Sequence, residues 1–164
     1  MKRNVVVIAV VGLVAIGYYF FSSSSKPEEV IAPTVNELPN LNIQKTDGAV
    51  TSLANAPEKS VLIFFDPSCD HCQNEAKQIS ERKQVFRDYA VFFVAADSMK
   101  NIAKFAKEYN LIEPNFYFAH AEGIDVYNTM GPMPSIPAIY IYNKKKLVKR
   151  FDGETKLEEI IKFL

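Results

Sequence analysis

The chain has 164 residues, about the length of one domain, and 48% of them are hydrophobic, which excludes an intrinsically disordered protein and is enough to bury a core. Its 19 Lys and Arg residues balance 19 Asp and Glu residues, so there is no surplus of positive charge to bind nucleic acid. Two cysteines are too few for a scaffold held by several disulfides, but Cys69 and Cys72 form a C-x-x-C motif and are the first candidates for a functional site.

An uncharged apolar run at residues 5–21 follows the cations Lys2 and Arg3 and precedes four serines. At ~1.5 Å per residue the run would extend ~26 Å as a helix, which is within the range of a membrane span. Cations at its start predict a cytoplasmic N-terminus. The bulky residues 18–21 do not suit signal peptidase, so we expect an uncleaved signal anchor over residues 1–25, with a cleaved signal peptide as the alternative.

The expected protein is therefore a single-pass protein of the cell membrane, with its main domain in the periplasm or another extracytoplasmic space. Residues 22–38 contain Ser, Pro and Glu without a period, which predicts an extended linker over residues 26–38. From residue 39 to residue 164, short apolar runs alternate with amphipathic stretches, which predicts one α/β domain.

The first elements of this domain lead to the cysteines. Residues 41–53 predict a hairpin, because Leu41 and Ile43 alternate with polar residues up to a turn signal at Asp47 and Gly48, and Val50 with Leu53 can form the returning strand. Residues 61–65 are a continuous apolar run of the length of a buried strand. The apolar residues that follow have helical spacing, so a helix is expected from the C-x-x-C motif to about Arg87.

The remaining elements follow from the same patterns. Strands are expected at residues 90–96, 116–119, 137–142 and 147–151. Helices are expected after Asp97 or Ser98, at residues 123–130, and at the C-terminus, where Thr155 and Glu158 suggest a capping box.

The two cysteines lie where a strand gives way to a helix. A helix N-terminus stabilises an anion, because its backbone N–H groups are unpaired and the helix dipole is positive there. We therefore expect Cys69 to be the thiolate that attacks a disulfide. Cys72, one turn further, is expected to resolve the resulting mixed disulfide.

Thiols in this arrangement could also serve other kinds of site. A structural zinc site needs four ligands and the chain has no second C-x-x-C motif, so no metal cofactor is expected. Gln73 stands where a c-type haem site has histidine, which excludes haem attachment. Soft sulfur and imidazole ligands suit copper, so a Cu(I) chaperone is the main alternative. It would use Cys69 and Cys72 with His71 or Met133. An envelope interaction module without redox activity is a further alternative.

The sequence around the cysteines, FFDPSCDHCQNEAKQ, resembles the active-site segment of the thioredoxin superfamily, and SIPAIYIYNKKKLVKRFDG resembles its cis-proline loop and terminal hairpin. The segments VFFVAAD and FYFAHAEGIDVYNTMG, with the hairpin LPNLNIQKTDGAVTSL, are similar to the TlpA/ResA-like branch of membrane-anchored thiol–disulfide oxidoreductases. The resemblance covers residues 39–164. It implies a thioredoxin-like α/β fold, with a central mixed sheet flanked by helices, an N-terminal β-hairpin and an inserted strand–helix unit.

The resemblance also implies roles for single residues. Cys69 would be the nucleophile, Cys72 the resolving cysteine, and Pro137 a cis-proline that faces them. A cis bond after Ile136 would leave backbone groups of that residue free to pair with an extended substrate. Glu75 matches an acidic position of the branch and could carry the proton of Cys72. Alternatively, Glu75 is a solvated residue that only complements the helix dipole.

The residues between the cysteines are expected to tune the reduction potential. An imidazolium at His71 would favour the thiolate and make the disulfide a stronger oxidant, whereas Asp70 would oppose it. The chain departs from thioredoxin at Ile63, where a buried aspartate would stand. It departs from peroxiredoxins at Leu62 and Asp66, where proline and threonine or serine precede the peroxidatic cysteine, so peroxidase activity is not expected.

The expected function is that of a membrane-anchored thiol–disulfide oxidoreductase that exchanges disulfides with envelope proteins through Cys69 and Cys72, as a monomer without a cofactor. The expected partners are protein dithiols or disulfides, with apocytochrome c as one candidate, and a membrane partner that recycles the pair. The architecture favours a reductase or exchange partner, whereas His71 favours an oxidant or isomerase.

Overall fold

The structure is a computed structural model that describes residues 35–164. The predicted membrane anchor, residues 1–25, and residues 26–34 of the predicted linker lie outside the described residues. No helix within residues 35–164 has the length and apolar character that a membrane span requires. The anchor and the extracytoplasmic location therefore stay predictions.

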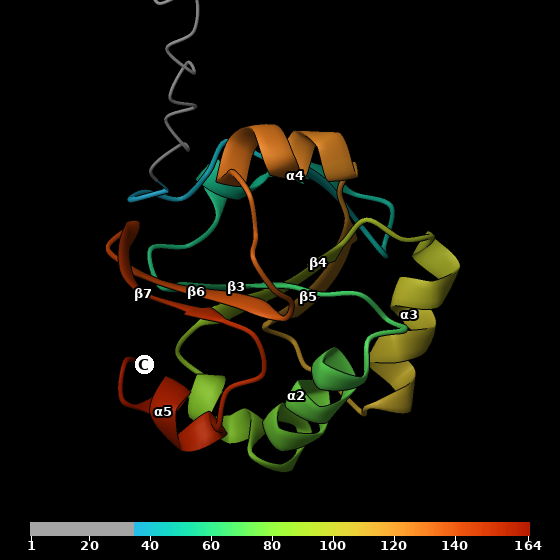
Figure 1. The fold of residues 1–164 in the computed structure, drawn as a ribbon, viewed down its shortest axis with the longest axis vertical. Coiled ribbons are helices and arrows are strands. Elements are labelled where there is room, and N and C mark those ends of the chain that lie inside the picture. The colour runs from blue at the N-terminus through green and yellow to red at the C-terminus, as the bar shows by residue number, and fades with distance from the viewer. Residues whose placement is uncertain (1–34) are drawn as a thin grey trace, which may run out of the picture. The chain divides into compact units, whose positions relative to one another are not determined.

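In the described part of the chain, a mixed sheet of seven strands forms the centre of the domain (Figure 1). The strands are β1 (Asn42–Lys45), β2 (Val50–Ser52), β3 (Ser60–Phe64), β4 (Ala90–Ala95), β5 (Phe116–His120), β6 (Ala138–Asn143) and β7 (Lys146–Asp152). Their order across the sheet is β2-β1-β5-β4-β3-β6-β7. β4 is parallel to both β3 and β5, and the other neighbouring strands pair antiparallel. The predicted mixed sheet and its N-terminal hairpin are confirmed.

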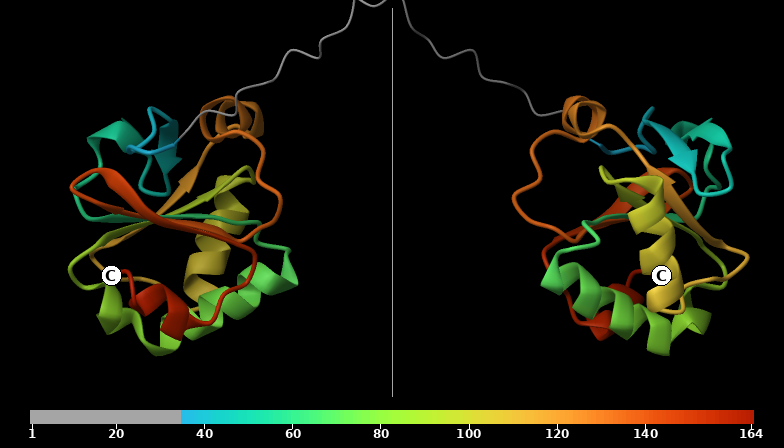
Figure 2. Two further views of the ribbon diagram at one scale, coloured as in Figure 1. Left: turned by 60° about the vertical axis from the view of Figure 1, so that its left-hand side comes forward. Right: turned by 90° about the vertical axis from the view of Figure 1, so that its right-hand side faces the viewer.

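Helices cover both faces of this sheet (Figures 1 and 2). One face carries α2 (Asp70–Glu81), α3 (Met99–Glu108) and α5 (Leu157–Ile161), and the other carries α4 (Gly123–Met130). Along β3 the side chains alternate between the faces, so that Ile63 packs in the core beneath α2 while Leu62 packs in the core on the α4 side. Burial on both faces explains the continuous apolar run of this strand.

The helix predicted to continue to Arg87 ends earlier. α2 stops at Glu81, because Arg82 leaves the helical region with φ −136° and ψ 37°. A short 3-10 turn, η2 (Lys83–Phe86), then returns Phe86 to the core. Because Phe86 returns to the buried face, its spacing from the apolar residues of α2 is that of a longer helix. The sequence pattern therefore predicted a helix that is too long.

The capping box predicted for the last helix is also wrong. The N-cap residue of α5 is Lys156, and its side chain makes no capping hydrogen bond. The Thr155 hydroxyl instead donates to the carbonyl of Gly153 at 3.0 Å. The backbone N–H of Leu157 is satisfied from another helix, since it donates to Gln78 Oε1 at 3.1 Å.

Residues 35–38, which precede the predicted start of the domain at residue 39, already pack against the domain. The Leu147 N–H donates to the carbonyl of Asn36 at 2.8 Å, and the Leu38 N–H donates to the carbonyl of Lys145 at 3.1 Å. Leu38 is buried in the core on the α4 side. A second 3-10 turn, η1 (Leu53–Asn55), follows the hairpin and buries Leu53 in the same core.

Candidate active site

The two cysteines lie just beyond the C-terminal end of β3, at the start of α2. A turn between these elements is held by Asp66, whose Oδ1 accepts hydrogen bonds from the N–H and the hydroxyl of Ser68 at 2.7 and 2.6 Å. The Asp66 carbonyl accepts from the N–H of Cys69 at 3.1 Å. Cys69 is the N-cap residue of α2, and its carbonyl accepts the first helical bond from the N–H of Gln73 at 3.0 Å. The predicted helix start at the C-x-x-C motif is confirmed.

The two thiols differ in their access to solvent. Both are free thiols; Cys69 is half-buried, whereas Cys72 is 2% exposed. Burial is the main reason why the pKa of Cys72 is raised to about 12, and the neighbouring Cys69 contributes to this value in the same direction. A substrate can therefore reach the sulfur of Cys69, while Cys72 needs a base before it can react at neutral pH.

Glu75 is a buried carboxyl group one turn after Cys72, on the inner face of α2. It is 1% exposed, and its Oε2 accepts a hydrogen bond from the N–H of Thr155 at 2.8 Å. Its Oε1 is buried without a hydrogen-bond partner among residues 35–164. Burial raises the pKa of Glu75, the hydrogen bond from the Thr155 N–H opposes this rise and the charge of Glu154 adds to it, so that the pKa is about 7. The alternative of a solvated glutamate is wrong.

The raised pKa of Glu75 predicts a pH-dependent stability. Between the ordinary pKa of 4.5 and about 7, the folded state holds a proton that the unfolded state has lost, so stability falls as the pH rises through this window. Glu75→Gln should therefore stabilise the protein by about 3 kcal/mol at pH ~8 and by under about 1 kcal/mol at pH ~5. Urea unfolding of the full chain at both values measures the difference.

Glu81→Gln, at the exposed end of the same helix, serves as the control and should not change the pH dependence. A Glu75→Gln variant that is destabilised equally at both pH values would contradict this explanation. The cost of burying a charge arises only where Glu75 is ionised, so removing the carboxylate has to change the free energy of unfolding more at the higher pH.

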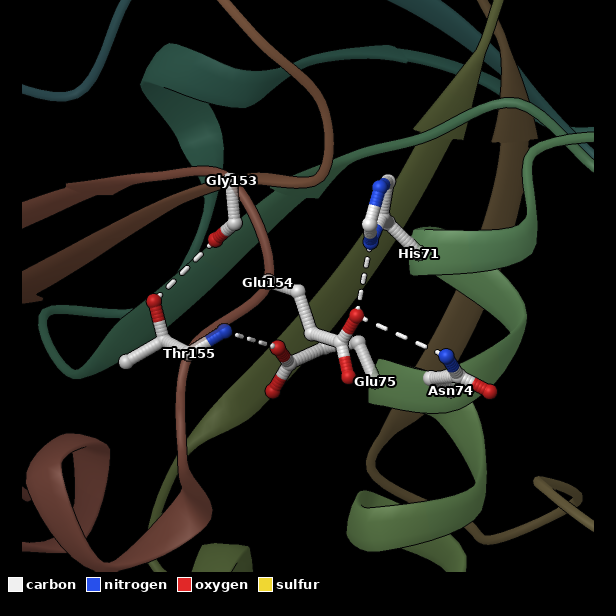
Figure 3. Close-up of polar contacts among 6 residues, drawn as sticks. All are labelled: His71, Asn74, Glu75, Gly153, Glu154 and Thr155. Carbon is white, nitrogen blue, oxygen red and sulfur yellow. Dashed lines mark hydrogen bonds and ion pairs between the residues drawn. The ribbon is translucent and has the colours of Figure 1, made fainter.

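The loop that follows β7 passes beside the first turns of α2 (Figure 3). We call residues 153–155 the crossing loop. Glu154 Oε2 lies 2.8 Å from His71 Nδ1, and Asn74 Nδ2 donates to the same oxygen at 3.5 Å. The hydrogen bond from His71 holds the pKa of Glu154 below its ordinary value. His71, which the sequence placed beside Cys69 as a tuning residue, is thus paired with a carboxylate from the far end of the chain.

The Ile136–Pro137 peptide bond is cis, as predicted, and no other cis bond occurs in residues 35–164. Pro137 directly precedes β6, whose Ala138 pairs with Phe64 at the end of β3. The cis-proline loop therefore lies at the same edge of the sheet as the cysteines. The N–H of Gly153 donates to the Pro137 carbonyl at 2.8 Å, which ties the crossing loop to it.

The copper ligands considered from the sequence are only partly brought together. Cys69 packs at the border of the core beneath α2, whereas Met133 packs against the core on the α4 side. Met133 lines a pocket with Val126, Ile136 and Asp66. Within the described chain, no group of three or more His, Cys, Asp or Glu side chains is placed to hold a metal ion.

The structure adds residues that sequence reasoning missed. Glu154 and the Thr155 N–H contact α2 across 80 or more positions of sequence, and no spacing in the sequence indicates such a contact. The one available signal was Gly153, at the end of the predicted hairpin. Its φ of +88° lies in the left-handed region that favours glycine, and a Cβ there would meet Ser135 Oγ at 3.4 Å. Asp70 is the first residue of α2, where its charge complements the helix dipole.

Comparison with protein families matches residues 35–151 to the AhpC/TSA family. No curated protein gives a significant match. A secreted Mycobacterium tuberculosis disulfide oxidoreductase homologous to E. coli DsbE is 19% identical with a TM-score of 0.61, over 75% of this chain and 92% of that one. A thioredoxin-like protein from Aeropyrum pernix is 21% identical with a TM-score of 0.59, over 76% and 89%. Arabidopsis thaliana ScoI with copper bound is 13% identical with a TM-score of 0.60, over 77% and 94%. These likenesses show an α/β thioredoxin-like fold.

Proposed function

The chain belongs to the AhpC/TSA family, and from this premise we propose that it is a thiol–disulfide oxidoreductase acting on envelope proteins through Cys69 and Cys72. One observation carries the proposal. Cys69, whose thiol is half-buried, is the N-cap residue of α2, the buried Cys72 lies one turn further, and the cis-proline loop lies at the same edge of the sheet. The likeness in fold to a disulfide oxidoreductase supports it.

In the proposed reaction, the Cys69 thiolate attacks one sulfur of a substrate disulfide. The substrate S–S bond breaks, a mixed disulfide with Cys69 forms, and the released sulfur leaves as a thiolate that takes up a proton. Cys72 then gives its proton to Glu75 and attacks the sulfur of Cys69. The substrate leaves with both of its sulfurs reduced, and the pair is left as a Cys69–Cys72 disulfide. An external dithiol returns the pair to the reduced state.

Glu75 suits the proton transfer of the second step. Its pKa of about 7 means that a large fraction is ionised at neutral pH and can accept a proton. The free Oε1 offers an acceptor position that no group among residues 35–164 occupies. Because the pKa of Cys72 is much higher, the transfer has to accompany formation of the new S–S bond.

We assign the protein more finely to the TlpA/ResA-like branch and place its domain outside the cytoplasm on an N-terminal anchor. The β1–β2 hairpin, the β5–α4 unit and Glu75 after the C-x-x-C motif support the branch. The apolar run at residues 5–21 behind Lys2 and Arg3 supports the anchor. The partners in this proposal are envelope proteins with disulfides or dithiols and a membrane protein that recycles the pair.

Peroxidase chemistry, which family membership alone would allow, is not proposed. Leu62 is buried in β3, where a peroxiredoxin has proline. Asp66 stands where threonine or serine would assist the peroxidatic cysteine, and its carboxylate is engaged by Ser68. A carboxylate at this position would also repel the peroxide-derived oxyanion.

A second candidate, Cu(I) delivery, is favoured by the likeness in fold to copper-bound ScoI. One experiment separates the two functions. The reduced full chain is tested for catalysis of disulfide exchange between a fluorescent peptide disulfide and a dithiol, and in parallel for Cu(I) binding against a competing chelator. We expect exchange in the wild type and none in Cys69→Ala. Tight Cu(I) binding that weakens in Met133→Leu, without exchange in the wild type, would favour copper delivery instead.

A further inference from the structure

A hydrogen-bonded contact between His71 and Glu154 joins the first turn of α2 to the crossing loop (Figure 3). Their atoms Nδ1 and Oε2 are 2.8 Å apart, although 83 positions of sequence separate the residues. Both side chains line one groove with Ser135, Ile136 and Lys156. The imidazole is thereby held two residues from Cys69, with its Nδ1 directed at the crossing loop.

The crossing loop is itself fixed on both sides of Glu154. The preceding residue, Gly153, donates its N–H to the Pro137 carbonyl at 2.8 Å. The following residue, Thr155, donates its N–H to Glu75 Oε2 at 2.8 Å. These backbone bonds aim the side chain of Glu154 at α2, where Asn74 also contacts it. The position of the Glu154 carboxylate is therefore fixed, and its contact with the His71 imidazole fixes the position of that ring.

We propose that Glu154 is a positioning residue for the redox pair, which holds the His71 imidazole toward the crossing loop and so limits how far the ring can stabilise the Cys69 thiolate. The inference rests on the proposed function. An imidazolium beside a thiolate stabilises the reduced form and makes the disulfide a stronger oxidant. A carboxylate that binds the ring offsets its charge and fixes its position. Without Glu154, the ring can turn toward Cys69.

Other charged groups near the pair stay the same in the comparison. Asp70 precedes His71 on α2, Lys156 lines the same groove, and Glu75 lies beneath the crossing loop. Because these groups are unchanged, a difference in potential between the variants reports on the Glu154 carboxylate and the His71 ring.

The test compares the full chain with Glu154→Gln, His71→Ala and the double variant, each equilibrated at pH ~5.5 in mixtures of reduced and oxidised glutathione. Two glutathione molecules reduce the Cys69–Cys72 disulfide and leave as glutathione disulfide, so the equilibrium constant gives the potential. Glu154→Gln should shift it toward the reduced protein by about threefold or more, which is ~14 mV at 29.6 mV per tenfold. In the His71→Ala background, the same substitution should have under about half of this effect on the potential.

A kinetic measurement and a control variant accompany this titration. Alkylation of Cys69 by iodoacetamide at the same pH should become faster in Glu154→Gln only when His71 is present, because the thiolate is the reacting form. Glu158→Gln also removes a carboxylate near α2, but Glu158 pairs with Arg82 at 2.8 Å beyond the other end of the helix. It should shift neither the potential nor the alkylation rate.

Equal shifts with His71 present and in the His71→Ala background would overturn the inference, because Glu154 would then act through its own charge or through the fold. No shift in Glu154→Gln would overturn it as well. A wild-type chain without a titratable Cys69–Cys72 disulfide is a different result, which overturns the proposed function and this inference together.

Discussion

Replacing Cys72 with serine is expected to leave the protein covalently joined to its substrates through Cys69. The first step needs only the Cys69 thiolate, so the mixed disulfide still forms. The second step needs the sulfur of Cys72, which lies buried one turn away and is the only other thiol of the chain. Because a serine hydroxyl cannot displace the substrate thiol, turnover should fall to background and adducts should accumulate.

The adducts are measured by non-reducing electrophoresis of cells that express the full-length Cys72→Ser chain, with mass spectrometry of the partners. They should disappear when a reductant is added. The double variant with Cys69→Ser should form none. If neither Cys72→Ser nor the double variant traps a protein, the substrate is a small molecule or the proposed order of attack is wrong.

Replacing Glu75 with glutamine is expected to slow the resolving step by ~10²-fold, the lower range for loss of a general base. Glutamine can still accept the hydrogen bond from the Thr155 N–H, so the local structure should persist. It cannot accept the proton of Cys72, whose pKa of about 12 leaves almost no thiolate at neutral pH. The formation of the mixed disulfide should keep its wild-type rate.

Single-turnover kinetics with a fluorescent peptide disulfide separate the two steps. In the wild type, the resolving rate should rise as the pH passes through about 7, where Glu75 ionises, and then level off. In Glu75→Gln this inflection should be absent, whereas the exposed control Glu81→Gln should keep it. An unchanged inflection in Glu75→Gln would assign the proton transfer to another group.

The two expected effects of Glu75→Gln point in opposite directions, toward higher stability at pH ~8 and lower activity. A buried carboxylate that lacks a partner for one oxygen destabilises the folded state as soon as it is charged. Such a group is retained at a site when its proton is needed there. The same substitution therefore tests whether the cost in stability and the proton transfer belong to one residue.

The fold was largely predictable because its signals are local. The apolar run at residues 61–65 indicates a strand buried on both faces, and the alternation that leads to the turn signal at Asp47 and Gly48 indicates the hairpin. The end of α2 was not predictable in this way. A change of backbone direction at Arg82 left Phe86 at the same apparent helical spacing, so periodicity alone could not distinguish one helix from a helix and a 3-10 turn.

The site was predictable only where its residues share a motif. Cys69 and Cys72 follow each other within one turn, and Pro137 stands in a recognisable loop before a strand. The burial of Glu75 depends on a backbone N–H that lies 80 positions further along the chain. Glu154 reaches His71 only because β7 and the crossing loop return to the start of α2. Contacts of this range arise from the sheet order and leave no periodic trace in the sequence.

If Cys69 and Cys72 form one reversible redox pair, a reductive titration of the full-length protein will show it. The protein is equilibrated in glutathione or dithiol buffers, its thiols are trapped by alkylation, and the labelled residues are identified by mass spectrometry. We expect a single two-electron transition in which Cys69 and Cys72 change state together, at a potential within the range of ~−270 to ~−120 mV known for such proteins. Two thiols that stay reduced across that range, or that titrate independently of each other, would show that Cys69 and Cys72 do not form a redox pair.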